Sequence, residues 1–167
     1  FKFEKRVHQI MFASPKALQP INNWKKDQDH LELCIAVDIG GSGLRIRISN
    51  YLDQKEFLDL GHVKAQNTAE SMSVFTNLAQ SLKEIILPFV TRAAALAVAG
   101  PISNGRCVLT NWIGDNDART LVADELPDVI FPRGKTLFLN DLEAGAYGII
   151  AAEENGNLES HFLQMWT

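Results

Sequence analysis

The sequence has few of the features that mark secreted, membrane or nucleic-acid-binding proteins. It contains only two cysteines among 167 residues, too few for a disulfide framework, so we expect free thiols in a reducing compartment. No apolar segment approaches the roughly 20 residues that span a bilayer. Acidic residues outnumber basic ones by 20 to 16, and the resulting formal net charge of -4 argues against nucleic acid and anionic membranes as partners.

The composition is that of a globular protein, with 46% hydrophobic and 22% charged residues. Residues 1–32 are polar, mixed in charge and interrupted by Pro15 and Pro20. They predict an amino-terminal extension with one or two short helices, which Trp24 could pin to the domain. Residues 33–167 then form the main folded unit, whose length suits one domain or one lobe of a larger enzyme.

Hydrophobic periodicity predicts a mixed α/β fold. The apolar run Leu33–Ile39 and the alternating segment Leu44–Asn50 are joined by a glycine-rich turn, which predicts a hairpin. A helix starting near Thr68 or Ser71 follows, because apolar residues recur there at helical spacing up to Ile86. Further strands are expected at 57–64, 93–99, 107–109 and 136–139, and further helices from Asp115 or Asp117 to Glu125, at 141–152 and at 158–165. Antiparallel strands followed by helical crossovers predict a mixed sheet with helices on its faces.

The segment Asp38–Arg45 is a candidate phosphate-binding hairpin. A strand follows its glycines and Gly-Lys-Ser/Thr is absent, which excludes a Walker A loop and a dinucleotide fingerprint. Glycines still let the backbone approach an anion and direct several N–H groups at it, and a serine adds a hydroxyl. The candidate phosphate-binding residues are Gly40, Gly41, Ser42, Gly43 and Arg45.

Two charged residues of this hairpin have alternative roles. Asp38 ends a buried strand and suits a Mg²⁺ ion held through water, or else it accepts hydrogen bonds from its own turn. Arg45 contacts phosphate or pairs with a nearby carboxylate. The residues alone leave both alternatives open.

The pair Asn140-Asp141 follows another predicted strand and begins a helix. The carboxyl ends of strands are where open sheets bind ligands. The Asn140 amide can both donate to and accept from a sugar hydroxyl, and Asp141 can accept the proton of a hydroxyl that attacks phosphorus. Helix capping is the alternative role of both side chains.

Four segments together resemble the bacterial-type (group A) glucokinases, which include protist glucokinases. They occur in the order and spacing of that family: Asp38–Arg45, Leu96–Pro101, Cys107–Trp112 and Phe138–Gly148. The family usually has Thr where Ser42 stands and Asn or Ser where Gly43 stands, so the second of these side chains is lost here.

The resemblance implies an actin-like (ribonuclease H-like) ATPase lobe with a mixed five-stranded sheet and helices on both faces. It also implies phosphorylation of the glucose 6-hydroxyl by ATP with Mg²⁺. Asp141 would be the catalytic base and Asn140 would bind glucose. Asn111 would contact substrate, or else serve in a turn or as a cap.

The family's second lobe, which grips nucleotide and sugar, is missing from the sequence. We therefore expect residues 33–167 to be the amino-terminal lobe, inactive or nearly so alone. Three alternatives stay open: a kinase of another hexose, a non-catalytic sugar-binding or interaction module, and a homodimer that rebuilds a cleft. We expect a cytoplasmic location, with a glycosomal or peroxisome-type organelle as the alternative.

Overall fold

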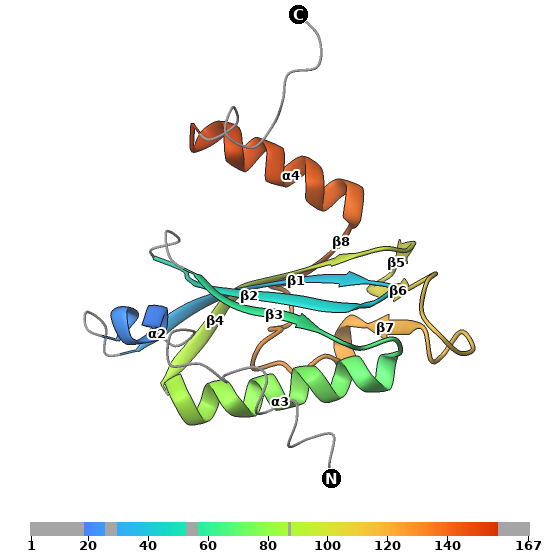
Figure 1. The fold of residues 1–167 in the computed structure, drawn as a ribbon, viewed down its shortest axis with the longest axis horizontal. Coiled ribbons are helices and arrows are strands. Elements are labelled where there is room, and N and C mark those ends of the chain that lie inside the picture. The colour runs from blue at the N-terminus through green and yellow to red at the C-terminus, as the bar shows by residue number, and fades with distance from the viewer. Residues whose placement is uncertain (1–18, 26–29, 53–56, 87, 157–167) are drawn as a thin grey trace, which may run out of the picture.

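The computed structural model describes residues 19–25, 30–52, 57–86 and 88–156 (Figure 1). Its main sheet has five strands in the order β3-β2-β1-β4-β8. The pairs β1–β2 and β2–β3 are antiparallel, whereas β4 runs parallel to β1 and β8 parallel to β4, so the predicted mixed sheet is confirmed. The strands are β1 (Leu31–Gly40), β2 (Gly43–Asn50), β3 (Phe57–Val63), β4 (Phe89–Val98) and β8 (Thr136–Asn140).

One helix lies on each side of this sheet, as predicted. Figure 1 shows α3 (Thr68–Ile86) along one face and α4 (Asp141–Glu154) over the other. Phe75, Leu78 and Leu82 of α3 are fully buried, because their helical spacing directs them together at the sheet. None of the α4 residues is buried.

The hydrophobic core lies between the sheet and α3. Alternate residues of β1 and β2 point into it, among them Ile35 and Ile46, which are at most 2% exposed. Phe75 meets Phe131 edge to face, with ring centroids 4.9 Å apart. The residues in between point to the opposite face, which carries small and charged side chains and stays open.

A second, three-stranded sheet was not fully predicted. It is formed by β5 (Ile102–Ser103), β6 (Arg106–Val108) and β7 (Thr120–Val122), in that order. The helix expected from Asp115 or Asp117 to Glu125 is wrong, since turns and β7 occupy this stretch and only a short 3-10 helix η1 (Ala123–Glu125) follows. The Asp115 carboxylate accepts the Ala118 N–H at 2.9 Å, so the expected cap closes a turn instead.

The amino-terminal region contributes the short helix α2 (Gln19–Trp24). Trp24 is 6% exposed and belongs to the core, in agreement with its expected packing role. The expected helix at 158–165 and most of the extension lie outside the described residues. No helix in the described ranges is long and apolar enough to cross a membrane.

We predict that Phe75→Ala lowers the free energy of unfolding by about 3–5 kcal/mol, because it leaves a cavity beside Phe131 in a fully buried core. Urea unfolding followed by tryptophan fluorescence measures this change. Leu52→Ala is the control, since that side chain is 67% exposed and its removal should change stability by less than about 0.5 kcal/mol. Equal effects of the two substitutions would contradict the packing described here.

The two free thiols should react at different rates. Burial raises the pKa of the Cys107 thiol to about 11, and it also raises the pKa of Cys34, which is only half-buried on the open face. A raised pKa lowers the fraction of reactive thiolate at about pH 8. We expect iodoacetamide to alkylate Cys34 faster than Cys107 in the folded chain, and both at similar rates in concentrated urea, as measured by mass spectrometry. Preferential labelling of Cys107 in the folded chain would contradict this order.

Candidate active site at the carboxyl edge of the sheet

The glycine turn joins β1 to β2, as the sequence predicted, with Gly40 paired to Gly43. Gly43 has a φ of 149°, a backbone conformation that side-chain-bearing residues rarely adopt. A Cβ atom at this position would lie 2.2 Å from the carbonyl oxygen of Val63 in β3. Only glycine fits where β3 approaches the turn so closely.

The carbonyl oxygens of the turn are held by donors from other segments. The indole N–H of the buried Trp112 donates to the Gly40 carbonyl at 3.2 Å, and the Gln66 amide donates to the Gly41 carbonyl at 3.4 Å. Two oxygens that would repel an anion are therefore engaged within the protein. Trp112 acts here in packing, because its ring is only 4% exposed.

Asp38 and Arg45 lie directly opposite each other on β1 and β2 and form an ion pair at 3.3 Å. Their side chains are 56% and 70% exposed. The carboxylate partner expected for Arg45 is thus present, but exposed ion pairs contribute little to stability. The arginine can consequently exchange this partner for a ligand at little cost.

A second ion pair, which was not predicted from the sequence, lies beside the first. Arg47 of β2 pairs with Asp59 of β3 at 3.1 Å, and its guanidinium lies 4.8 Å from the centroid of the Phe57 ring. The alternation of Arg45 and Arg47 along β2 was the signal that both arginines share a face.

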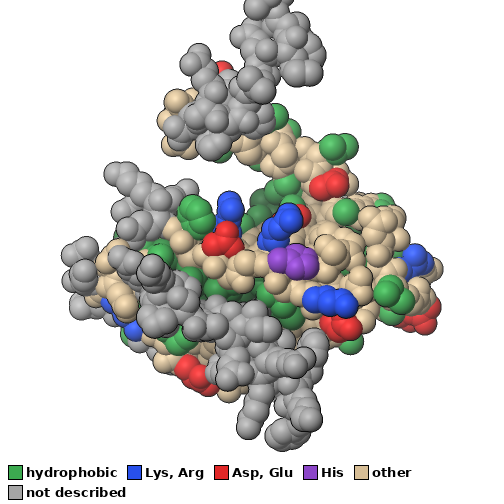
Figure 2. Space-filling model, in the orientation of Figure 1, with side chains coloured by type: hydrophobic (Ala, Val, Ile, Leu, Met, Phe, Trp, Pro, Cys, Tyr) green, Lys and Arg blue, Asp and Glu red, His purple; other side chains and the backbone are tan. Residues whose placement is uncertain are grey.

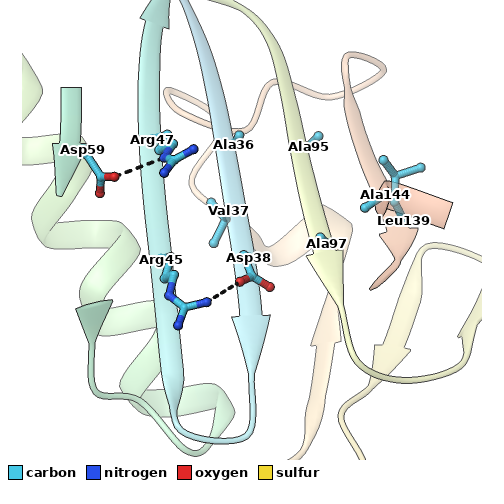
Figure 3. A pocket seen from close by; sticks show the side chains of 10 residues that line it. All are labelled: Ala36, Val37, Asp38, Arg45, Arg47, Asp59, Ala95, Ala97, Leu139 and Ala144. Carbon is cyan, nitrogen blue, oxygen red and sulfur yellow. Dashed lines mark hydrogen bonds and ion pairs between the residues drawn. The ribbon is translucent and has the colours of Figure 1, made fainter. Parts of the chain in front are cut away.

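The ion pairs line one side of a groove of about 470 Å³ on the open face of the sheet (Figure 3). Its floor consists of small side chains, among them Ala36 and Ala95, and Ala144 of α4 also lines it. Figure 2 shows acidic and basic side chains together on the surface beneath α4. Of the predicted site residues, Asp38 and Arg45 line this groove, whereas the asparagines and Asp141 lie outside its lining.

The pair Asn140-Asp141 joins β8 to α4. The Leu142 N–H donates to Oδ1 of Asn140 at 3.0 Å and to Oδ1 of Asp141 at 2.9 Å, so both side chains cap the helix. The Asn140 amide also donates to the Gly100 carbonyl at 3.4 Å. Capping holds the Asp141 carboxylate, which is exposed to solvent, at the positively polarised end of α4.

The glycine turn and the Asn-Asp pair share one edge of the sheet. Ile39, Val98 and Asn140 are aligned on the neighbouring strands β1, β4 and β8. Since neighbouring strands lie about 4.8 Å apart, Asn140 is roughly 10 Å from the start of the turn. Asn111 reaches the same region, because its Cβ lies 2.8 Å from the position that a Cβ on Gly41 would take.

The chemistry of this edge fits a nucleotide phosphate. A Cβ atom added to Gly40 would have no neighbouring atom within 4 Å, so the space beside it is open. The turn also offers backbone N–H groups and the Ser42 hydroxyl. Among the described residues, no group of three His, Cys, Asp or Glu side chains could hold a metal directly. The exposed Asp38 carboxylate could accept hydrogen bonds from water bound to a cation.

Comparisons with known proteins identify the family of this chain. The family model for glucokinase matches residues 35–160. Two curated relatives come from Trichomonas vaginalis: probable glucokinase 2 is 48% identical over 150 residues, and glucokinase 1 is 47% identical over 150 residues. The alignments cover 89% and 90% of this chain but only 40% of each relative.

Solved structures give the same result for the fold. The chain superposes on glucokinase from Balamuthia mandrillaris, solved in complex with glucose, with a TM-score of 0.83 and 31% identity, covering 92% of this chain and 42% of that one. Leishmania braziliensis glucokinase has the same fold, with a TM-score of 0.70 at 23% identity, over 96% of this chain and 41% of that one. The expected actin-like architecture is confirmed, and the chain belongs to the glucokinase family.

Proposed function

We propose that the protein containing this chain transfers the terminal phosphoryl group of ATP to the 6-hydroxyl of glucose. The observation that carries the proposal is the shared sheet edge, where the glycine turn and the Asn140-Asp141 pair lie within roughly two strand spacings of each other. An anion site beside a carboxylate base is the arrangement that phosphoryl transfer to a hydroxyl requires. The glucose complex of the Balamuthia relative supports glucose as the acceptor.

The phosphate side of the site is the glycine hairpin. Its backbone N–H groups and Ser42 would bind the nucleotide phosphates, and Arg45 would leave Asp38 to neutralise phosphate charge. Mg²⁺ bound with the nucleotide would supply further charge neutralisation. Asp38, released from Arg45, would accept hydrogen bonds from water bound to that ion.

The sugar side is formed by Asn140, Asp141 and Asn111. Asn140 would bind a sugar hydroxyl through its amide, and Asn111, lying against Gly41, would contact the substrate where phosphate and sugar meet. Asp141 would accept the proton of the attacking hydroxyl as its oxygen forms the new bond to phosphorus and the bond to the ADP oxygen breaks.

Closure by a second lobe is part of this proposal. In the structure Asp141 and Arg45 are both solvent-exposed, and phosphoryl transfer to a sugar in preference to water requires a closed site. We propose that residues 33–167 are one lobe and that residues 1–167 alone turn over little or no glucose.

The choice of sugar and the location of the protein are separate parts of the proposal. A panel of hexoses tested on the whole protein distinguishes glucose from another hexose as the acceptor. An intracellular, reducing location agrees with the two free thiols.

We predict that Asp141→Asn in the whole protein lowers kcat for glucose-dependent ADP formation by about 10²–10⁴-fold, because the base is lost. The KM values for glucose and ATP should change little. Glu143→Gln is the matched control, since it removes the same charge from the same helical turn, and it should leave kcat within about twofold. Equal losses in both variants would show that Asp141 acts through the helix charge and is not the base.

Substitutions at two glycines of the turn should affect different quantities, nucleotide binding in one case and stability in the other. We expect Gly40→Ala to weaken MgADP binding about tenfold or more, measured by calorimetry, because its methyl group would enter the space open to phosphate, while the unfolding free energy changes little. Gly43→Ala should lower the unfolding free energy by roughly 3 kcal/mol or more, because it combines backbone strain with the clash against Val63. Unchanged MgADP binding by Gly40→Ala would overturn the phosphate role of the turn.

A further inference from the structure

A β-bulge in β3 changes which residues face the open side of the sheet. Along β2, Arg45 and Arg47 are two residues apart, whereas their partners on β3, His62 and Asp59, are three apart. One extra residue therefore lies in β3 at this point, and Gly61 beside it has a left-handed φ of 69°.

The bulge brings His62 out of the core. Leu58 and Leu60 point inward, so strict alternation would direct residue 62 inward as well. The extra residue shifts the alternation, and His62 is exposed on the same face as Arg45 while Val63 takes the buried position. Bulges often redirect a side chain in this way near functional sites.

Asp59 holds the bulge in place. Its Oδ1 accepts the Gly61 N–H at 2.8 Å, and its Oδ2 pairs with Arg47. The conformation that exposes His62 is thus fixed by a side-chain contact in addition to the ladder of the sheet.

The exposed imidazole lies against the glycine turn. Nε2 of His62 is 3.4 Å from the Ser42 hydroxyl and 2.9 Å from the position that a Cβ on Gly43 would take. Gly43 has no side chain of its own, and the imidazole of His62 fills the side-chain space beside it. Arg45 is its direct partner across the strands, so two nitrogen donors stand side by side next to the turn.

We propose that His62 is a further phosphate-binding residue of this hairpin, an inference that rests on the phosphate role proposed for the glycine turn. Without nucleotide, His62 shares a hydrogen bond with Ser42. With nucleotide, Nε2–H donates to a phosphate oxygen beside the turn, and the Ser42 hydroxyl donates to the same phosphate. His62 thereby supplies from β3 a polar group that residue 43 lacks.

The test compares binding of inorganic tripolyphosphate and of MgADP to the whole protein, measured by calorimetry for the parent, His62→Ala and His62→Gln. Gln keeps an N–H donor at a similar reach. His30→Ala is the matched control, because His30 is also exposed but precedes β1 at the opposite end of that strand, 3.8 Å from Glu32. Glucose binding and the midpoint of thermal unfolding are measured for every variant.

We expect His62→Ala to raise the Kd of both phosphate probes about tenfold, the loss that one charge-assisted hydrogen bond produces. His62→Gln should recover most of this affinity, and His30→Ala should match the parent. Glucose affinity and thermal stability should stay at parent values. The KM for ATP should rise in His62→Ala while kcat stays within about twofold.

Several results would overturn the proposal. Phosphate binding by His62→Ala that equals the parent's would do so, as would a parallel loss of glucose affinity and thermal stability, which indicates a structural role. A parent that does not bind tripolyphosphate would overturn it too. If the parent lacks glucose-dependent ADP formation but His62→Ala still loses phosphate affinity, the proposed kinase activity fails and the role of His62 stands.

Discussion

The close approach of β3 to the glycine turn is the constraint on which the rest of the site depends. The Val63 carbonyl lies where a side chain on residue 43 would be, so the two segments can pack only with glycine there. Trp112 and Gln66 hold the turn from other directions, because each donates a hydrogen bond to one of its carbonyl groups. A turn held at so many points keeps its N–H groups in place before any ligand binds, which reduces the entropic cost of binding.

The two faces of the sheet carry different kinds of side chain. The inner face is packed against α3 by large aliphatic and aromatic side chains, which stabilise the fold. The outer face carries alanines and two exposed ion pairs, which leave space and charge but bury little apolar area. Stability and ligand chemistry therefore use opposite faces of the same strands, and residues such as Ile46 and Arg45 differ in role although they are neighbours in sequence.

Much of this arrangement could be predicted from the sequence, because the long elements carry strong periodic signals. The hairpin, α3 and the start of α4 were expected within a few residues, and the shared edge of Asp38 and Asn140 follows from strands that end together. The strand expected at residue 93 begins at Phe89, since Thr91 is buried and donates to the Val129 carbonyl, a tertiary contact that no local pattern reveals.

The short sheet and the bulge could not be predicted, because both depend on pairing with strands elsewhere in the chain. Strands of two or three residues such as β5 and β7 are too short to show a period, and pairing with β6 determines them. Asp115 has the composition of a helix cap, but its carboxylate closes a turn. The position of His62 depends on one extra residue opposite Ile46, and alternation by itself predicts an inward side chain there.

The bulge also determines how a change in chain length would act at this point. Asp59 and His62 are three residues apart yet face the same side, so loss of the extra residue between them would restore regular alternation and leave both on the open face, with Val63 still buried. A deletion here would therefore remove the bend of β3 without moving the imidazole into the core. An insertion of one more residue that formed no second bulge would do the reverse, because it would turn His62 inward and Val63 outward.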